Sequence, residues 1–146
     1  MLTNRNWTEL LSLFAAHKVR YLVVGGYAVM KYTEPRFTKD LDLWIALDAA
    51  NAQAVFAALK EFGAPLAELT AADFQEEGQV YQMGRAPLRV DVLMSVDGLT
   101  FENAWPNRVE TNLAGVKVPF ISKSDLILAK RAAGRDQDLL DLKNLE

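Results

Sequence analysis

The sequence predicts an α/β or α+β domain built around one sheet, because short strand-like runs and amphipathic helical stretches are mixed along the whole chain. The length of 146 residues is typical of one domain, and 51% hydrophobic with 24% charged residues is an ordinary globular composition. No internal repeat, low-complexity tract or linker divides the chain. We therefore expect a single domain over residues 1–146 with one hydrophobic core.

The N-terminal part of the chain predicts three helices and two strands. Asn6 and Glu9 form a capping pair before an amphipathic run, and Asp48 is placed to cap a longer helix that ends at Gly63. A residue before proline disfavours helix, so a short helix must stop before Pro35. In chain order we expect a helix from Asn6 to about His17, a strand at 21–24, a helix at 27–32, a strand at 40–45 and a helix at 49–62.

The C-terminal part predicts four strands and a final helical region. Apolar runs on both sides of Gly84-Arg85-Ala86-Pro87 are typical of paired strands, and Ala114-Gly115 is typical of a hairpin turn. In chain order we expect a short helix near 71–76, strands at 80–83, 88–96, 108–113 and 116–121, and a helical region that begins at Ser122 or Ser124 and is interrupted at Gly134.

Composition excludes several classes of function. The net charge of −3 and pI near 5.2 argue against attachment to nucleic acid or anionic membrane by bulk charge. The chain has no cysteine and one histidine, His17, so thiol catalysis, iron–sulfur clusters and metal sites with several imidazoles are excluded. Any metal would be held by oxygen ligands, which favours Mg²⁺ or Mn²⁺. With no apolar run near the length of a membrane span and no secretion signal, we expect a cytoplasmic protein.

Aspartates on two predicted strands are candidates for a metal site. Side chains alternate along a strand, so Asp40 and Asp42 share one face, while Asp91 lies between two valines on another strand. If the strands are neighbours, the three acids form a cluster that needs a counter-charge, and divalent cations are the natural partner. The alternative is that Asp40 and Asp42 lie on a solvated sheet face and Asp91 at an edge.

A glycine pair adds a second signal upstream of these acids. Gly25-Gly26 follows a predicted strand and precedes a predicted helix, where backbone N–H groups and a helix N-terminus can hold an anion. Alone, a glycine pair after a strand is more often a tight turn, and the spacing is not that of a dinucleotide-binding fingerprint.

Together these residues resemble the nucleotidyltransferase superfamily of DNA polymerase β, whose signature is a strand, Gly-Gly or Gly-Ser, a spacer, Asp-x-Asp and a third Asp. The segments that carry this resemblance are Val23-Val24-Gly25-Gly26, Arg36-Phe37-Thr38-Lys39-Asp40-Leu41-Asp42 and Val90-Asp91-Val92. Within this superfamily the chain looks most like AbiEii-type stand-alone enzymes. That likeness is carried by the Gly-Gly-x-Ala stretch from Gly25, by the Arg-x-Thr-x-Asp-x-Asp run and by the tail with Lys130, Gly134 and Arg135. Gly26 stands where many members have serine, which leaves only backbone donors there.

The resemblance implies a nucleotidyltransferase fold, with a mixed central sheet flanked by helices and C-terminal helices. It implies transfer of a nucleoside monophosphate from an NTP such as ATP to a hydroxyl acceptor, with release of pyrophosphate and with Mg²⁺ or Mn²⁺ as cofactor. The implied catalytic and metal-binding residues are Asp40, Asp42 and Asp91. The implied nucleotide-binding residues are Gly25, Gly26, Arg36, Thr38, Lys123, Lys130 and Arg135, although each lysine is as readily a surface charge and Arg135 as readily an ion-pair partner of Asp138.

Two functions remain open at this point. The first is an active enzyme, with RNA, a protein or a small molecule as acceptor, or a toxin-type modifier of RNA or protein with an antitoxin partner. The alternative is a catalytically inactive module of the same fold that binds a nucleotide or a partner protein. We expect no membrane partner for either.

Overall fold

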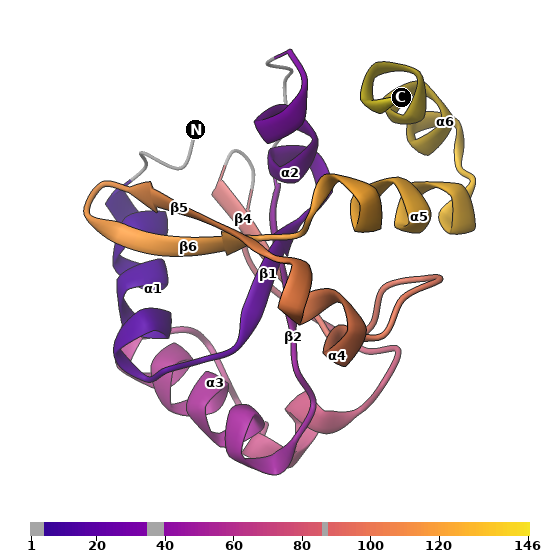
Figure 1. Cartoon of the computed structure of the whole chain (residues 1–146). Coiled ribbons are helices and arrows are strands. Elements are labelled where there is room, and N and C mark those ends of the chain that lie inside the picture. The colour runs from indigo at the N-terminus through magenta and orange to yellow at the C-terminus, as the bar shows by residue number, and fades with distance from the viewer. Residues whose placement is uncertain (1–4, 35–39, 86–87) are drawn as a thin grey trace.

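A six-stranded mixed sheet forms the centre of the computed structural model, which describes residues 5–34, 40–85 and 88–146 (Figure 1). The strand order is β3-β4-β2-β1-β6-β5. The strands are β1 Tyr21–Val24, β2 Asp40–Ile45, β3 Val80–Arg85, β4 Leu88–Leu93, β5 Val109–Leu113 and β6 Val116–Phe120. The α-helices are α1 Arg5–Ala16, α2 Gly25–Tyr32, α3 Ala49–Phe62, α4 Phe101–Ala104, α5 Lys123–Ala133 and α6 Asp136–Leu145, with 3₁₀ helices η1 Ala71–Gln75 and η2 Trp105–Asn107.

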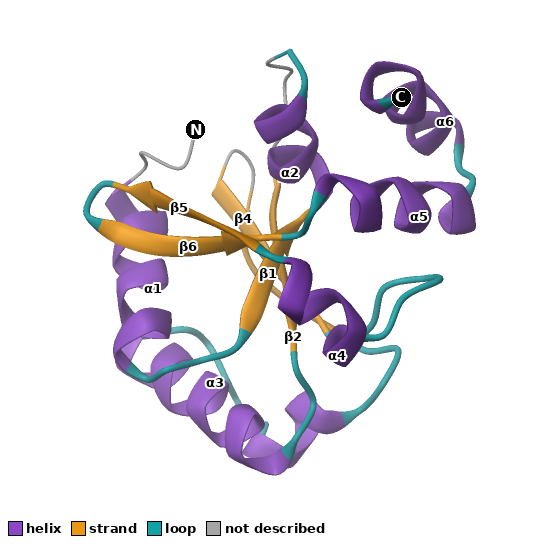
Figure 2. Ribbon diagram, viewed as in Figure 1, coloured by secondary structure: helices purple, strands orange, loops and turns teal. Residues whose placement is uncertain are grey.

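Helices cover both sides of the sheet (Figure 2). Helices α1 and α3 pack together on one side, and α4, α5 and α6 lie on the other, with α2 at the end of β1 (Figure 1). Alternation along β2 decides which side chains face which layer. Leu41 and Leu43 are fully buried in the core, whereas Trp44 faces the opposite side and meets the ring of Phe101 edge-on.

The central strands bring together segments that are distant in sequence. Strand β2 pairs with β1 in the antiparallel sense and with β4 in the parallel sense. In the second pairing Asp40 lies opposite Arg89, and Asp42 lies opposite Asp91. The acids on the two strands therefore share one register and one face of the sheet.

The fold class predicted from the sequence is confirmed, and most predicted elements occur at the expected positions. Helix α3 ends at Gly63, which has a left-handed φ of 91°, and Ser122 caps α5 through the backbone N–H of Asp125. Four details differ by more than one residue or in kind: α2 begins at Gly25, β3 continues to Arg85, β4 ends at Leu93, and α4 with η2 was not expected. A helix of four residues is too short to show periodicity, and contacts with Trp44 and Trp105 hold Phe101 there.

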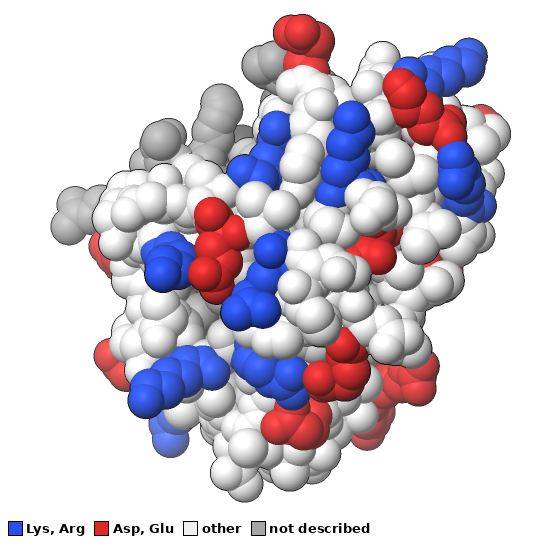
Figure 3. Space-filling view, viewed as in Figure 1, with Lys and Arg blue, Asp and Glu red and all other residues white. Residues whose placement is uncertain are grey.

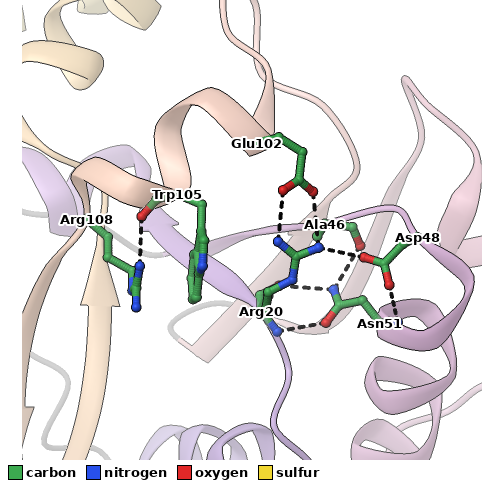
Figure 4. Close-up of polar contacts among 7 residues, drawn as sticks. All are labelled: Arg20, Ala46, Asp48, Asn51, Glu102, Trp105 and Arg108. Carbon is green, nitrogen blue, oxygen red and sulfur yellow. Dashed lines mark hydrogen bonds and ion pairs between the residues drawn. The ribbon is translucent and has the colours of Figure 1, made fainter.

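A polar cluster ties the start of β1 to α3 and α4 (Figure 4). The guanidinium of Arg20 pairs with Glu102 at 3.0 Å and with Asp48 at 2.8 Å. Asn51 is buried and makes three hydrogen bonds to backbone: its Oδ1 accepts from Arg20 N at 2.7 Å, and its Nδ2 donates to Arg20 O at 3.0 Å and Ala46 O at 2.8 Å. These bonds fix the loop before β1 against the end of β2. None of the helices in the described ranges is both long and apolar enough to cross a membrane.

We predict that Asn51→Ala lowers the free energy of unfolding by roughly 2–4 kcal/mol, because Arg20 N–H and Ala46 O lose their contacts with Asn51 in a partly buried to buried position and Arg20 O loses one of its two donors. Urea unfolding measures this loss. Gln53→Ala is the matched control, since Gln53 is exposed on the same helix, and it should change stability by less than about 0.5 kcal/mol. Equal effects of the two substitutions would contradict the role assigned to Asn51.

Candidate active site

Three aspartates lie together on the face of the sheet that α5 and α6 cover. Asp42 and Asp91 are direct neighbours across the β2–β4 pair, and Asp40 is two residues before Asp42 on the same face. Asp91 is only 7% exposed, and Asp42 is partly buried. The neighbouring strands that the cluster requires are therefore present, and neither the solvated-face nor the edge interpretation describes Asp91.

Burial and crowding of negative charge change the protonation of Asp42. Burial, followed by the charges of Asp91 and Asp40 and a hydrogen bond with Asp91, raises the pKa of Asp42 to about 7 from an ordinary 3.8. The positive charge of Lys130 acts in the opposite direction on the same pKa. Near neutral pH Asp42 is therefore partly protonated, and a cation bound beside it would favour its charged form.

Arg89 is a member of this cluster and is absent from the residues predicted from the sequence. Its Nη2 lies 2.8 Å from Asp40 Oδ2, and its Nε lies 3.3 Å from Asp91 Oδ1. The nearby carboxylates, Asp91 foremost, raise the pKa of Arg89. The sequence holds the signal for this placement, because Arg89 precedes Asp91 by two residues on β4 and strand alternation puts both on one face.

The glycine pair brings backbone up to the acids. Gly25 has φ of +70°, and a Cβ at this position would lie 2.0 Å from Asp42 Oδ2. Any other residue would therefore clash with the carboxylate and strain the backbone as well. Gly26 follows in the first turn of α2 and is buried. The pair leaves the N-terminus of α2 next to Asp42, as an anion site at that position requires.

The C-terminal helices and the junction between them carry two basic side chains that differ in burial. Lys130 of α5 is buried, and its Nζ lies 3.1 Å from Asp138 Oδ1 and 3.0 Å from Asp141 Oδ2, both on α6. Arg135 is 77% exposed, and its Nε lies 2.7 Å from Asp138 Oδ2. Lys130 thus joins α5 to α6, while the guanidinium of Arg135 is open to solvent at the junction.

Two adjoining cavities surround these groups, of about 280 and 270 Å³. Both are lined by Gly25, Asp42, Lys130, Arg135 and Asp138. The cavity of about 270 Å³ is also lined by Gly26, Asp40 and Gln137. The cavity of about 280 Å³ is also lined by several apolar residues and by Ser95 and Asp97. Lys123 is exposed at the start of α5 and lines neither cavity, and Arg36 and Thr38 lie outside the described residues.

The chemical type of the donor atoms in the aspartate cluster suits a hard divalent cation. All are carboxylate oxygens, and Asp91 Oδ1 is buried and accepts no hydrogen bond from the described residues. As the side chains stand, the described residues hold no group of three or more His, Cys, Asp or Glu placed to share one metal ion. The guanidinium of Arg89 instead lies against both Asp40 and Asp91. Asp42, with which no described lysine or arginine forms an ion pair, is thus the best placed of the three acids.

Residues 7–146 match the model of a family described as "Nucleotidyltransferase of unknown function (DUF6036)". The chain belongs to this nucleotidyltransferase family. A search of curated protein sequences finds no match. The AbiEii-type likeness stays a prediction, because the description of the matched family names no such enzyme.

Solved structures with the same fold include two antibiotic-modifying enzymes. One is the lincosamide antibiotic adenylyltransferase LnuA with bound lincomycin, with a TM-score of 0.60 and 23% identity over 98% of this chain and 96% of that chain. Another is ANT(2")-Ia in complex with adenylyl-2"-tobramycin, with a TM-score of 0.59 and 13% identity over 94% and 84%. A third is an antigenic nucleotidyltransferase-like protein from Paracoccidioides brasiliensis, with a TM-score of 0.55 and 20% identity over 93% and 71%.

We predict that Asp42→Asn stabilises the metal-free nucleotidyltransferase at pH 8 more than at pH 5. The folded pKa of about 7 lies above the ordinary 3.8, so wild-type stability is lost as pH rises through this window, whereas asparagine does not ionise. Melting temperatures in EDTA at the two pH values measure the difference.

The control for this prediction is Asp48→Asn. Hydrogen bonds from Asn51 N–H and Arg20 outweigh burial and lower the pKa of Asp48, so its charge stabilises the fold at both pH values. The control variant should therefore melt at a lower temperature than wild type at pH 5 and at pH 8. A similar fall for Asp42→Asn at pH 8 would show that Asp42 is an ordinary structural acid.

We predict that Lys130 and Arg135 respond differently to substitution. Lys130→Met leaves two buried carboxylates without their ammonium partner and should lower the free energy of unfolding by about 3–5 kcal/mol. Arg135→Ala should change it by less than about 1 kcal/mol, because that side chain is exposed. Urea unfolding separates the two. If Arg135 instead proves as destabilising as Lys130, its side chain is part of the helix junction.

Proposed function

We propose that this nucleotidyltransferase moves a nucleoside monophosphate from an NTP to a hydroxyl group of a small-molecule acceptor in a Mg²⁺-dependent reaction that releases pyrophosphate. The observation that carries the proposal is that Asp42, paired with Asp91 across two strands, lines two cavities together with Gly25, Lys130 and Arg135. Carboxylates, basic side chains and a helix N-terminus around one cavity are the groups that a metal-bound triphosphate needs.

Each residue of the site would have a separate role in the reaction. Asp42 and Asp91, joined by Asp40, would hold the divalent cation, which supplies charge neutralisation of the triphosphate and activation of the attacking oxygen. Gly25 and Gly26 would let backbone N–H groups approach the phosphates closely. Arg135 would neutralise the outer phosphates from its exposed position. The catalytic gain would come from positioning and from charge stabilisation.

Three observations support a small acceptor. The cavity of about 280 Å³ is lined by apolar residues together with several charged ones, and its volume is close to the lower end of small-molecule pockets. On the face shown in Figure 3, acidic and basic side chains of the described residues are interspersed, without the basic stripe typical of nucleic-acid binding. LnuA and ANT(2")-Ia, of the same fold, carry lincomycin and adenylyl-2"-tobramycin in their structures.

We predict that at least one of ATP, GTP, CTP and UTP binds in the presence of Mg²⁺ or Mn²⁺, and much more weakly in EDTA. Without the cation, the triphosphate would face the uncompensated aspartates. Calorimetry with each nucleotide measures this dependence. Asp42→Asn is the control, and it should lose both the binding enhancement by metal and any turnover.

Turnover is tested with labelled NTPs and a panel of hydroxylated small molecules, with cellular RNA and protein as parallel acceptors. Transfer of label to a small molecule with release of pyrophosphate supports the proposal. Transfer to RNA or protein would replace the acceptor and favour the toxin-type function. Metal-dependent binding without any transfer would mean an inactive nucleotide-binding module. Equally tight binding in EDTA, or no binding at all, would contradict the proposed metal-dependent enzyme.

A further inference from the structure

We propose that Arg89 is the internal counter-cation of the aspartate cluster in the metal-free protein, and that it must leave Asp40 before a divalent cation binds all three acids. Arg89 is in this sense a positioning residue that competes with the metal. The inference rests on the proposed function, because it concerns the same three aspartates.

The register of the sheet builds this contact. Asp40 and Arg89 are directly opposite each other in the parallel β2–β4 pair, so their side chains leave the sheet at one point. Arg89 Nη2 lies 2.8 Å from Asp40 Oδ2 and 3.4 Å from Asp91 Oδ2, and Nε lies 3.3 Å from Asp91 Oδ1. One planar guanidinium thus bridges carboxylates on two strands, which the fork of arginine donors allows.

The same contact is incompatible with a three-carboxylate metal site. The Asp40 oxygen that faces Arg89 is occupied by a charged donor, and a divalent cation at that oxygen would lie within a few ångströms of the guanidinium. Like charges at such a distance repel strongly in a partly buried site. Among the described side chains, none forms such an ion pair with Asp42, and Lys130 lowers its pKa only through longer-range charge. Asp42 can therefore meet a cation first, whereas Asp40 and Asp91, which both lie against the guanidinium, complete the site only after Arg89 moves.

Exposure gives Arg89 room to move. Its side chain is 38% exposed and that of Asp40 is 31% exposed, whereas the side chain of Asp91 is 10% exposed. The guanidinium can therefore turn toward solvent while the carboxylate of Asp91 stays fixed in the sheet. In the metal-free protein Arg89 offsets part of the repulsion among the acids, so its loss should weaken the fold in EDTA and strengthen cation binding.

The experiment compares Arg89→Met with wild type for affinity toward Mn²⁺ alone, measured by electron paramagnetic resonance without nucleotide. We expect the variant to bind Mn²⁺ about tenfold more tightly or better, because a nearby positive charge is removed. Its melting temperature in EDTA should be lower than that of wild type. The matched control is Arg108→Met, which removes the same charge from an arginine paired with Glu110 and should leave Mn²⁺ affinity within about twofold of wild type.

The outcomes separate the two proposals. Equal or weaker Mn²⁺ binding by Arg89→Met, with wild-type binding intact, overturns the role of Arg89 alone. No Mn²⁺ binding by either protein overturns the proposed metal-dependent function. If Arg89→Met does not fold, the wild type still decides: on addition of Mg²⁺, the Arg89 Nε–H resonance, assigned through bonds, should shift as the ion pair with Asp40 opens. An unchanged resonance at saturating Mg²⁺ overturns the inference.

Discussion

Charge compensation on one face of the central sheet is the constraint on which the rest of this structure depends. The β2–β4 register sets Asp42 against Asp91, and Asp40 follows on the same face. Carboxylates this close cannot all ionise without opposite charge nearby. Burial, and after it the charges of Asp91 and Asp40, raises the pKa of Asp42 to about 7. A fold that keeps such a cluster must surround it with cations or leave it ready to accept one.

The C-terminal helices meet the same constraint in a different way. Lys130 is held between Asp138 and Asp141, so one buried ammonium joins α5 to α6 and also reaches Asp42 with its charge. A buried lysine beside two acids is stable only as a fully paired group. The position of α6 over the site is therefore set by the charge of Lys130 as much as by apolar packing. Arg135, on the same junction, keeps its guanidinium in solvent.

Local sequence pattern predicts much of this arrangement. Alternation places Asp40 and Asp42 on one face, and the strand–Gly25-Gly26 junction marks the approach of backbone to that face. The same alternation would have placed Arg89 beside Asp91, so that residue was within reach of sequence reasoning. The pairing of Lys130 with Asp141 was not, because Gly134 interrupts the helical period and the angle between α5 and α6 depends on tertiary packing.

The balance of charge around the cavities bears on how a nucleotide would enter. Among the described residues that line them, four carboxylates face the two cations Lys130 and Arg135. A bare triphosphate would add negative charge to a site that already has an excess of it, and Lys130 is neutralised by its own partners. One divalent cation carries the charge that this excess lacks. Under the proposed function, the donor would therefore enter together with its metal, and Asp42 would receive the cation before the phosphates meet Arg135.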